Sequence, residues 1–429
     1  MSQPLDLTVT VDNAACGAID AAAGLRARTL NVLFDWLPPS FDRPDAFRVL
    51  AYGSAIPDDG GGPWMGRTAY GRNQAYAAIS QLRSIWQRRV IEYRVSGRYP
   101  FSAGWDLSGP VDRGHLDAVG LDLAQAGQRL FTFLFRTGDE SLRKIANLLE
   151  DALRHNDQLI EIHSDQLFAP WWMLYTPPEP QTDLLDQDAP WDLEGFWGFR
   201  HLIQHTVRRH PRWFPEITSP AGQLAVGLNV DHRIDADTRI GEVRYVSPLT
   251  EFFSARARTV VRDRKAELAK AMQAADFPDK LIYFACHGRV TGGDGTVVAQ
   301  ASLTLSDDDP ILTTDFVEWF DNQPLSTNPV VFIGACQGGQ MSSMFYDAFG
   351  LELLKAGANC VIGPQVDLPA PFAARYADAL FSRFLAGNCR LGDAVRDLTR
   401  SCALERRTPL GLIISLYRGL DTRLVIQGE

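Results

Sequence analysis

The sequence predicts an α/β fold with a mainly parallel sheet flanked by helices, and three observations lead to this prediction. Short apolar runs of β-prone residues recur in the second half of the chain, among them Leu224–Val230, Leu281–Cys286 and Val330–Ala335. Segments with helical spacing of apolar residues separate these runs, which is typical of βαβ units. Two of the runs stop at a reactive side chain, His287 or Cys336, that glycine follows closely. The carboxyl ends of parallel strands are where α/β proteins place their chemistry.

The first part of the chain contains few signals. Alternating apolar and polar residues indicate strands at Leu5–Val11 and Ala46–Tyr52. Pro57–Pro63 has three glycines between two prolines and is expected to be a loop. Stretches rich in Ala, Leu, Gln and Arg favour helices at about residues 69–96 and 121–155. Nothing in this part places a nucleophile beside a base.

From about residue 158 strands and helices alternate. Each expected strand is a β-prone run, and each expected helix has apolar residues three or four positions apart. Gly357 is the stop signal of one helix, and Thr313 or Thr314 is the expected cap of another. Besides the runs above, strands are expected at Gln158–His163, Ser302–Ser306 (an edge strand), Asn359–Gly363 and Leu410–Leu416. Helices are expected at residues 243–258, 264–275, 312–320, 341–356 and 370–385, and around His201 and His205.

Composition and charge narrow the function classes. At 429 residues the chain is long enough for two domains. The formal net charge of −10 argues against nucleic acid as a partner, because phosphate binding needs a basic excess. No window is apolar enough for a membrane span, and the first residues lack the pattern of a signal peptide. The six cysteines include no C-x-x-C pair, which is typical of reduced thiols, so a cytoplasmic location is expected.

His287 and Cys336 suit a base and its nucleophile. They are 49 residues apart (336 − 287 = 49), enough for one crossover between strands. A thiol at neutral pH needs a base to become a thiolate, and an imidazole at the same strand edge supplies one. For the oxyanion of acyl transfer we expect donors in the backbone amides of Gly288 and Cys336. The expected chemistry is hydrolysis of an amide through a thioester. Cys286 should face the opposite side of its strand and pack in the core.

Other interpretations compete with this one. A buried cysteine is usually a small hydrophobe and a lone histidine a hydrogen-bonded polar group, but the matched strand ends favour catalysis. Gly334–Gly338 also fits a G-x-C-x-G elbow, whose histidine follows the nucleophile. No histidine follows His287, so chain order excludes the elbow, and histidine before cysteine is the order of caspases. His201 and His205 lack the glutamate of the zinc-protease motif, so no metal site is expected.

These segments resemble the CHAT-domain family of caspase-like peptidases. Phe284–Gly288 with Leu303–Ser306 is similar to the family's histidine region, and Val330–Cys336 with Gly350–Gly363 to its cysteine region. Weaker similarity extends the match to about residues 150–429. The resemblance implies a caspase-hemoglobinase fold and a cysteine endopeptidase with its dyad at the two strand ends. It also implies a regulated bacterial effector in anti-phage defence or programmed cell death that cuts one specific protein.

The resemblance also divides the chain and indicates partners. Residues 146–429 are expected to form the caspase-like peptidase domain. Residues 1–145 are expected to form an accessory or regulatory region, and one form that this region could take is a pseudo-caspase-like unit. A protein substrate and an activating protein or signal are expected, but no cofactor, nucleic acid or membrane. Gln337 and Asp367 are candidate substrate-binding residues. Asp367 follows the strand that ends at Gly363, in a loop that helps to shape the family's specificity pocket, and it would favour a basic P1 side chain unless it is simply solvated. A catalytically silent scaffold and a small-molecule amidase with the same dyad are the alternative functions.

Overall fold

The computed structural model describes residues 24–179, 190–207, 214–236, 244–291, 300–321, 324–334, 349–387 and 389–427. The strand expected at Leu5–Val11, part of the helix expected at residues 341–356, and two candidate site residues, Cys336 and Gln337, lie outside the described residues.

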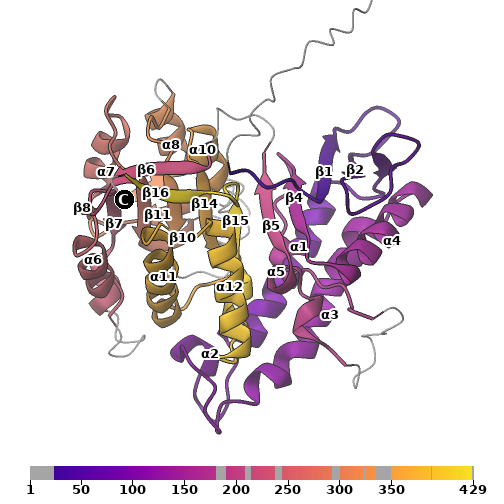
Figure 1. Ribbon diagram of the computed structural model, residues 1–429, viewed down its shortest axis with the longest axis horizontal. Helices are drawn as coiled ribbons and strands as arrows, with labels where there is room; N and C mark the ends of the chain where they lie inside the picture. Colours follow the sequence, from indigo (N-terminus) through magenta and orange to yellow (C-terminus); the bar gives the residue numbers. More distant parts are fainter. Residues whose placement is uncertain are drawn as a thin grey trace, which may run out of the picture.

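One sheet of 11 strands runs through the molecule, in the order β3-β2-β1-β4-β5-β15-β14-β13-β9-β7-β8. In Figure 1 the strands from the first part of the chain lie on the right and most of those from the second part on the left. Strands β8, β7, β9, β13 and β14 pair in parallel, as do β1, β4 and β5. The predicted α/β fold with a mainly parallel sheet is therefore confirmed. The strands of this sheet are β1 (Leu30–Leu37), β2 (Ala46–Tyr52), β3 (Trp64–Arg67), β4 (Leu159–His163), β5 (Leu202–Thr206), β7 (Ala225–Val230), β8 (Arg258–Arg262), β9 (Leu281–Ala285), β13 (Val330–Ile333), β14 (Cys360–Pro364) and β15 (Ile414–Tyr417).

Helices cover both faces of this sheet. The side chains of β9 alternate between the faces: Leu281 and Tyr283 pack in the cluster that contains α6 and α11, whereas Ile282 and Phe284 pack in the cluster that contains α7, α8 and α10. A strand buried on both faces has no polar side, which is why it forms a continuous apolar run in the sequence. The helices are α1 (Arg72–Trp86), α2 (Pro100–Ala103), α3 (His115–Arg136), α4 (Glu140–His155), α5 (Trp197–Arg200), α6 (Val246–Ser254), α7 (Lys265–Met272), α8 (Thr313–Phe320), α10 (Leu351–Lys355), α11 (Ala370–Leu385) and α12 (Leu391–Leu404).

Two smaller sheets complete the fold. One has the order β10-β11-β12, and the other pairs β16 with β6. The edge strand expected at Ser302–Ser306 is instead the middle strand of the first small sheet, because β11 bonds to a partner on each side. Their strands are β6 (Glu216–Pro220), β10 (His287–Thr291), β11 (Gln300–Thr304), β12 (Pro310–Leu312) and β16 (Arg423–Gln427).

Several expected elements have different limits in the structure. The helix expected at residues 121–155 is two helices, since Asp139 caps the second by accepting a hydrogen bond from the Leu142 amide. The helix expected at residues 243–258 ends at Ser254, and the next residues form β8 because Val260 and Val261 pair with β7.

Two further expectations are wrong in detail. The strand expected at Leu410–Leu416 starts with a 3-10 turn at Pro409–Ile413 and becomes a strand only at Ile414. The residue that caps α8 is Leu312, and not Thr313 or Thr314.

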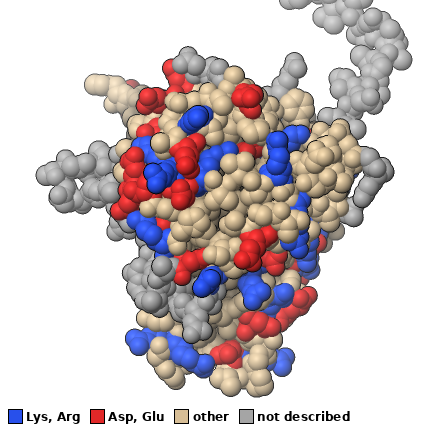
Figure 2. Space-filling model, turned by 90° about the vertical axis from the view of Figure 1, so that its left-hand side faces the viewer, with Lys and Arg blue, Asp and Glu red and all other residues tan. Residues whose placement is uncertain are grey.

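Strands from both predicted regions belong to the large sheet, and α4 crosses the boundary predicted at residue 145. That boundary stays a prediction. Within the described residues no helix is long and apolar enough to cross a membrane. No group of three or more His, Cys, Asp or Glu side chains in the same part of the chain is arranged to hold a metal ion. On the face shown in Figure 2, Lys and Arg side chains lie interspersed with Asp and Glu side chains.

Candidate active site

His287 lies two residues beyond β9, where the chain leaves the large sheet. It is the first residue of β10 and is paired with Thr304 of β11, and Gly288 follows it, buried, opposite Leu303. The His287 side chain is 14 % exposed. Cys286, the residue before it, is fully buried among apolar side chains, as expected for a cysteine on the opposite face. The change of sheet therefore brings the imidazole to the carboxyl edge of β9.

Asp231 lies beside His287, although the sequence did not single it out as a site residue. It follows β7 directly, and its amide donates a hydrogen bond of 2.8 Å to the Ala285 carbonyl, which extends the pairing of β7 with β9. Its fully buried carboxylate has Oδ2 3.7 Å from His287 Nε2. The sequence did contain a signal for Asp231, because the apolar run Leu224–Val230 stops at this charged residue just as the later run stops at His287.

Arg233 holds the Asp231 carboxylate in place. Its Nε donates to Oδ1 over 2.8 Å and its Nη2 to Oδ2 over 2.7 Å, while its amide also donates to Oδ1. The same guanidinium bonds the Leu305 carbonyl and pairs with Asp308. The hydrogen bond to Asp231 is the main reason why the pKa of Arg233 is raised. The carboxylate thus has two fixed oxygens, of which Oδ2 faces the imidazole.

The other imidazole nitrogen has no partner among the described residues. His287 Nδ1 is buried and makes no hydrogen bond to them. A buried polar atom without a partner is costly in a folded protein, and a role in the site would explain why His287 Nδ1 is left in this position.

The approach to Cys336 is described as far as Gly334. Gly334 directly follows β13, and its amide donates a hydrogen bond of 2.8 Å to the carbonyl of Phe284 in β9. A Cβ at Gly334 would lie 2.3 Å from the hydroxyl of Tyr245, which is hydrogen-bonded to the hydroxyl of Tyr283. Only glycine fits this contact. The pairing of β13 with β9 joins residues 49 apart along its whole length, from Val330 with Leu281 to Ile333 with Phe284.

Asp367 is bonded to the first part of the chain. Its carboxylate accepts a hydrogen bond of 3.2 Å from Gln87, in the turn that extends α1. Two residues earlier, the buried Gln365 accepts a hydrogen bond of 2.6 Å from Arg83 of α1 and donates one to Tyr417 of β15. Helix α1 and the turn after it therefore hold the loop that follows β14. Among the described residues, the structure shows no hydrogen bond or ion pair between Asp367 and His287.

His201 and His205 do not share a helix face. His205 lies on β5, with Nδ1 accepting from Trp171 and Nε2 donating to the Ser164 carbonyl; His201 precedes that strand and accepts from the Gln158 amide. The helix expected here is wrong, because the segment is buried between β4 and β15. Burial lowers the pKa of His201 to about 3 and that of His205 to about 4.

These two histidines should make the protein less stable in mild acid. Each ring is neutral when folded, whereas the unfolded ring has a pKa of about 6.5. The stabilisation is complete above that pH and is lost as the pH falls toward the folded pKa, by about 2 kcal/mol per ring between pH 7 and pH 5. Urea unfolding at pH 7 and pH 5 measures the decrease in the free energy of unfolding between the two values. This decrease should be about 2 kcal/mol smaller in His205→Gln than in wild type. Equal decreases for wild type and His205→Gln would contradict this account.

Comparison with known proteins finds a relative in sequence and a weak likeness to solved structures. A probable protease of Vitiosangium sp. (strain GDMCC 1.1324) is 26% identical over 240 aligned positions, and the alignment covers 51% of this chain and 28% of the relative. The chain thus spans less than a third of that protein. No family model matches the chain. Two structures of the Saccharomyces cerevisiae separase–securin complex align over 92% of this chain and 30% of theirs, at 10% and 11% identity and TM-scores of 0.39 and 0.43.

Proposed function

We propose that this protein is a caspase-like cysteine endopeptidase with His287 and Cys336 as its catalytic dyad. The observation that carries the proposal is the buried, unpartnered Nδ1 of His287 at the carboxyl edge of β9. The pairing of β9 with β13 supports it, because its offset of 49 residues (330 − 281 = 49) equals the separation of the dyad (336 − 287 = 49). The relative named as a probable protease supports the same class of activity.

The proposed reaction is acyl transfer through a thioester. His287 Nδ1 takes the proton of the Cys336 thiol, and the thiolate attacks the carbonyl carbon of the scissile peptide bond. The backbone amides of Gly288 and Cys336 donate hydrogen bonds to the oxyanion. The imidazolium returns the proton to the leaving amine as the C–N bond breaks. Water then attacks the thioester, with His287 again as base, and releases the acid product and the thiol.

The proposed substrate is one specific protein, and the proposed role is that of a regulated effector in anti-phage defence or programmed cell death. Gln337 and Asp367 are the proposed substrate-binding residues, and residues 1–145 the regulatory region. The hydrogen bonds of Arg83 and Gln87 to the loop after β14 support such regulation, because a movement of α1 would release that loop.

Labelling with iodoacetamide at pH 7 tests the dyad without a known substrate. Cys336 should react faster than the other thiols by at least about tenfold, since only the thiolate is nucleophilic. The buried Cys360 and Cys402 are internal controls, because burial raises the pKa of each thiol to about 12. His287→Ala should remove the fast reaction, whereas Cys389→Ser should keep it. Slow labelling of Cys336 in the folded wild type would favour the silent scaffold. If the fast reaction occurs but no new protein termini form in the native lysate, the small-molecule amidase is favoured.

A further inference from the structure

Asp231 occupies the position of a third member of the proposed site. Strands β7 and β9 are neighbours in the large sheet, and Asp231 and His287 follow them at the same edge. The carboxylate faces Nε2 at 3.7 Å, so the other nitrogen is left for the thiol. We infer that Asp231 is a positioning residue: it keeps the proton of His287 on Nε2 and stabilises the imidazolium. This inference rests on the proposed function.

The chemistry of the two nitrogens gives the physical reason. A neutral imidazole carries one proton, and only the nitrogen without it can accept another. A carboxylate beside Nε2 accepts hydrogen bonds and donates none, so it favours the tautomer with the proton on Nε2. That tautomer leaves the lone pair of Nδ1 free for the thiol proton. The distance of 3.7 Å is longer than a hydrogen bond, and such catalytic contacts commonly shorten when the imidazolium forms.

A structural ion pair with Arg233 does not by itself require Asp231 to lie beside His287. Arg233 alone binds both carboxylate oxygens, so the charge is compensated without the histidine. Asp279 provides the comparison: it is a 1 % exposed carboxylate paired with Arg262 at 2.7 Å, with no histidine among its ion pairs. A substitution there removes a buried charge of the same kind and leaves the imidazole untouched.

The wild-type protein offers a direct test that needs no variant. Nuclear magnetic resonance of the ¹⁵N-histidine-labelled protein at neutral pH reports which ring nitrogen carries the proton. We expect His287 to carry it on Nε2. A ring with its proton on Nδ1 and none on Nε2 would overturn the inference.

Two substitutions test the consequence for the thiol. Asp231→Asn offers an amide that can donate to Nε2, which allows the wrong tautomer, and it should slow alkylation of Cys336 at pH 7 by at least about tenfold. Asp231→Glu should restore part of the rate, and Asp279→Asn should leave the rate within about twofold of wild type. Only variants with an intact circular dichroism spectrum are compared. An unchanged alkylation rate and tautomer in folded Asp231→Asn would overturn the inference.

The same data separate this inference from the proposed function. If Cys336 in wild type reacts no faster than the buried thiols, the dyad itself is wrong. If wild type reacts fast and His287→Ala does not, but Asp231→Asn equals wild type, the dyad stands and the role of Asp231 is wrong.

Discussion

Replacing Cys336 by alanine is expected to lower the rate of proteolysis by at least about 10⁴-fold, because in the proposed mechanism the Cys336 thiolate forms the acyl-enzyme. The measurement is the set of new protein termini that forms when the purified chain is mixed with its native lysate. The termini that wild type produces should be missing with the variant. Thermal unfolding should be unchanged within a few degrees, so that the loss cannot come from unfolding.

Cys286→Ala is the matched control for this experiment. It removes a thiol one residue from His287, but from a side chain buried in the core. We expect it to destabilise the protein by about 1 kcal/mol and to keep the cleavage pattern. Wild-type termini forming at the wild-type rate with Cys336→Ala would refute the assignment of the nucleophile.

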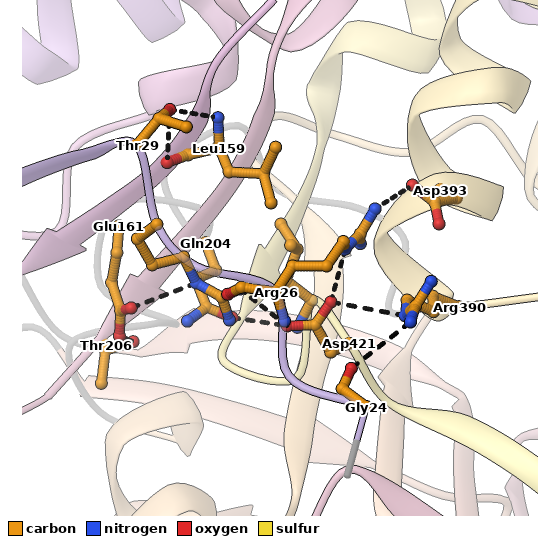
Figure 3. A network of polar contacts seen from close by, with 12 residues as sticks. Gly24, Arg26, Thr29, Leu159, Glu161, Gln204, Thr206, Arg390, Asp393 and Asp421 are labelled. Atoms are coloured by element: carbon orange, nitrogen blue, oxygen red, sulfur yellow. Dashed lines mark hydrogen bonds and ion pairs between the residues drawn. The ribbon is translucent and has the colours of Figure 1, made fainter. Parts of the chain in front are cut away.

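Replacing Asp421 by alanine is expected to lower the free energy of unfolding by about 4 kcal/mol, the cost of breaking a buried ion pair on one side. The Asp421 side chain is fully buried and binds Arg26 at 2.6 Å, with Arg390 at 3.6 Å (Figure 3). It also binds Arg28 at 2.6 Å. Without the carboxylate, the three guanidinium groups would repel one another, because the negative charge that they share would be gone.

These contacts join the two ends of the described chain, because Arg26 and Arg28 precede β1 and Asp421 follows β15. Burial raises the pKa of Asp421, but the hydrogen bonds from Arg28 and Arg26 outweigh it and the pKa is lowered. The stabilisation is therefore present above the usual pKa of a carboxyl group and is lost in acid, as the pH falls through the folded value.

Urea unfolding at pH 7 measures this effect. Asp397→Ala is the control, since Asp397 is a 54% exposed carboxylate on α12 whose contact with Arg396 is at the surface. It should change the free energy of unfolding by less than about 0.5 kcal/mol. A loss below about 1 kcal/mol for Asp421→Ala would show that the arginines find water or other partners when the carboxylate is absent.

Much of the fold could be predicted because its strands are buried on both faces. Such strands appear as uninterrupted apolar runs, so β7, β9, β13 and β14 were placed within a residue or two of their limits. Helix α11 was predicted with its limits, because its apolar residues recur at helical spacing and Pro369 precedes it. The strand at His201 and His205 was missed because burial between two other strands, and not local spacing, decides its conformation.

The sequence by itself determined the types of the candidate reactive residues and their order, and it predicted a place for each at the end of a strand. It indicated His287 directly, because a histidine that ends an apolar run is a local pattern. An apolar run also ends at Asp231, but the sequence could not pair this residue with His287, which is 56 residues later in the chain (287 − 231 = 56). Only the tertiary structure decided that β7 lies next to β9, since strand order depends on which chain segments pack together. The same holds for helix α1 and the loop after β14, whose contact joins residues about 280 apart.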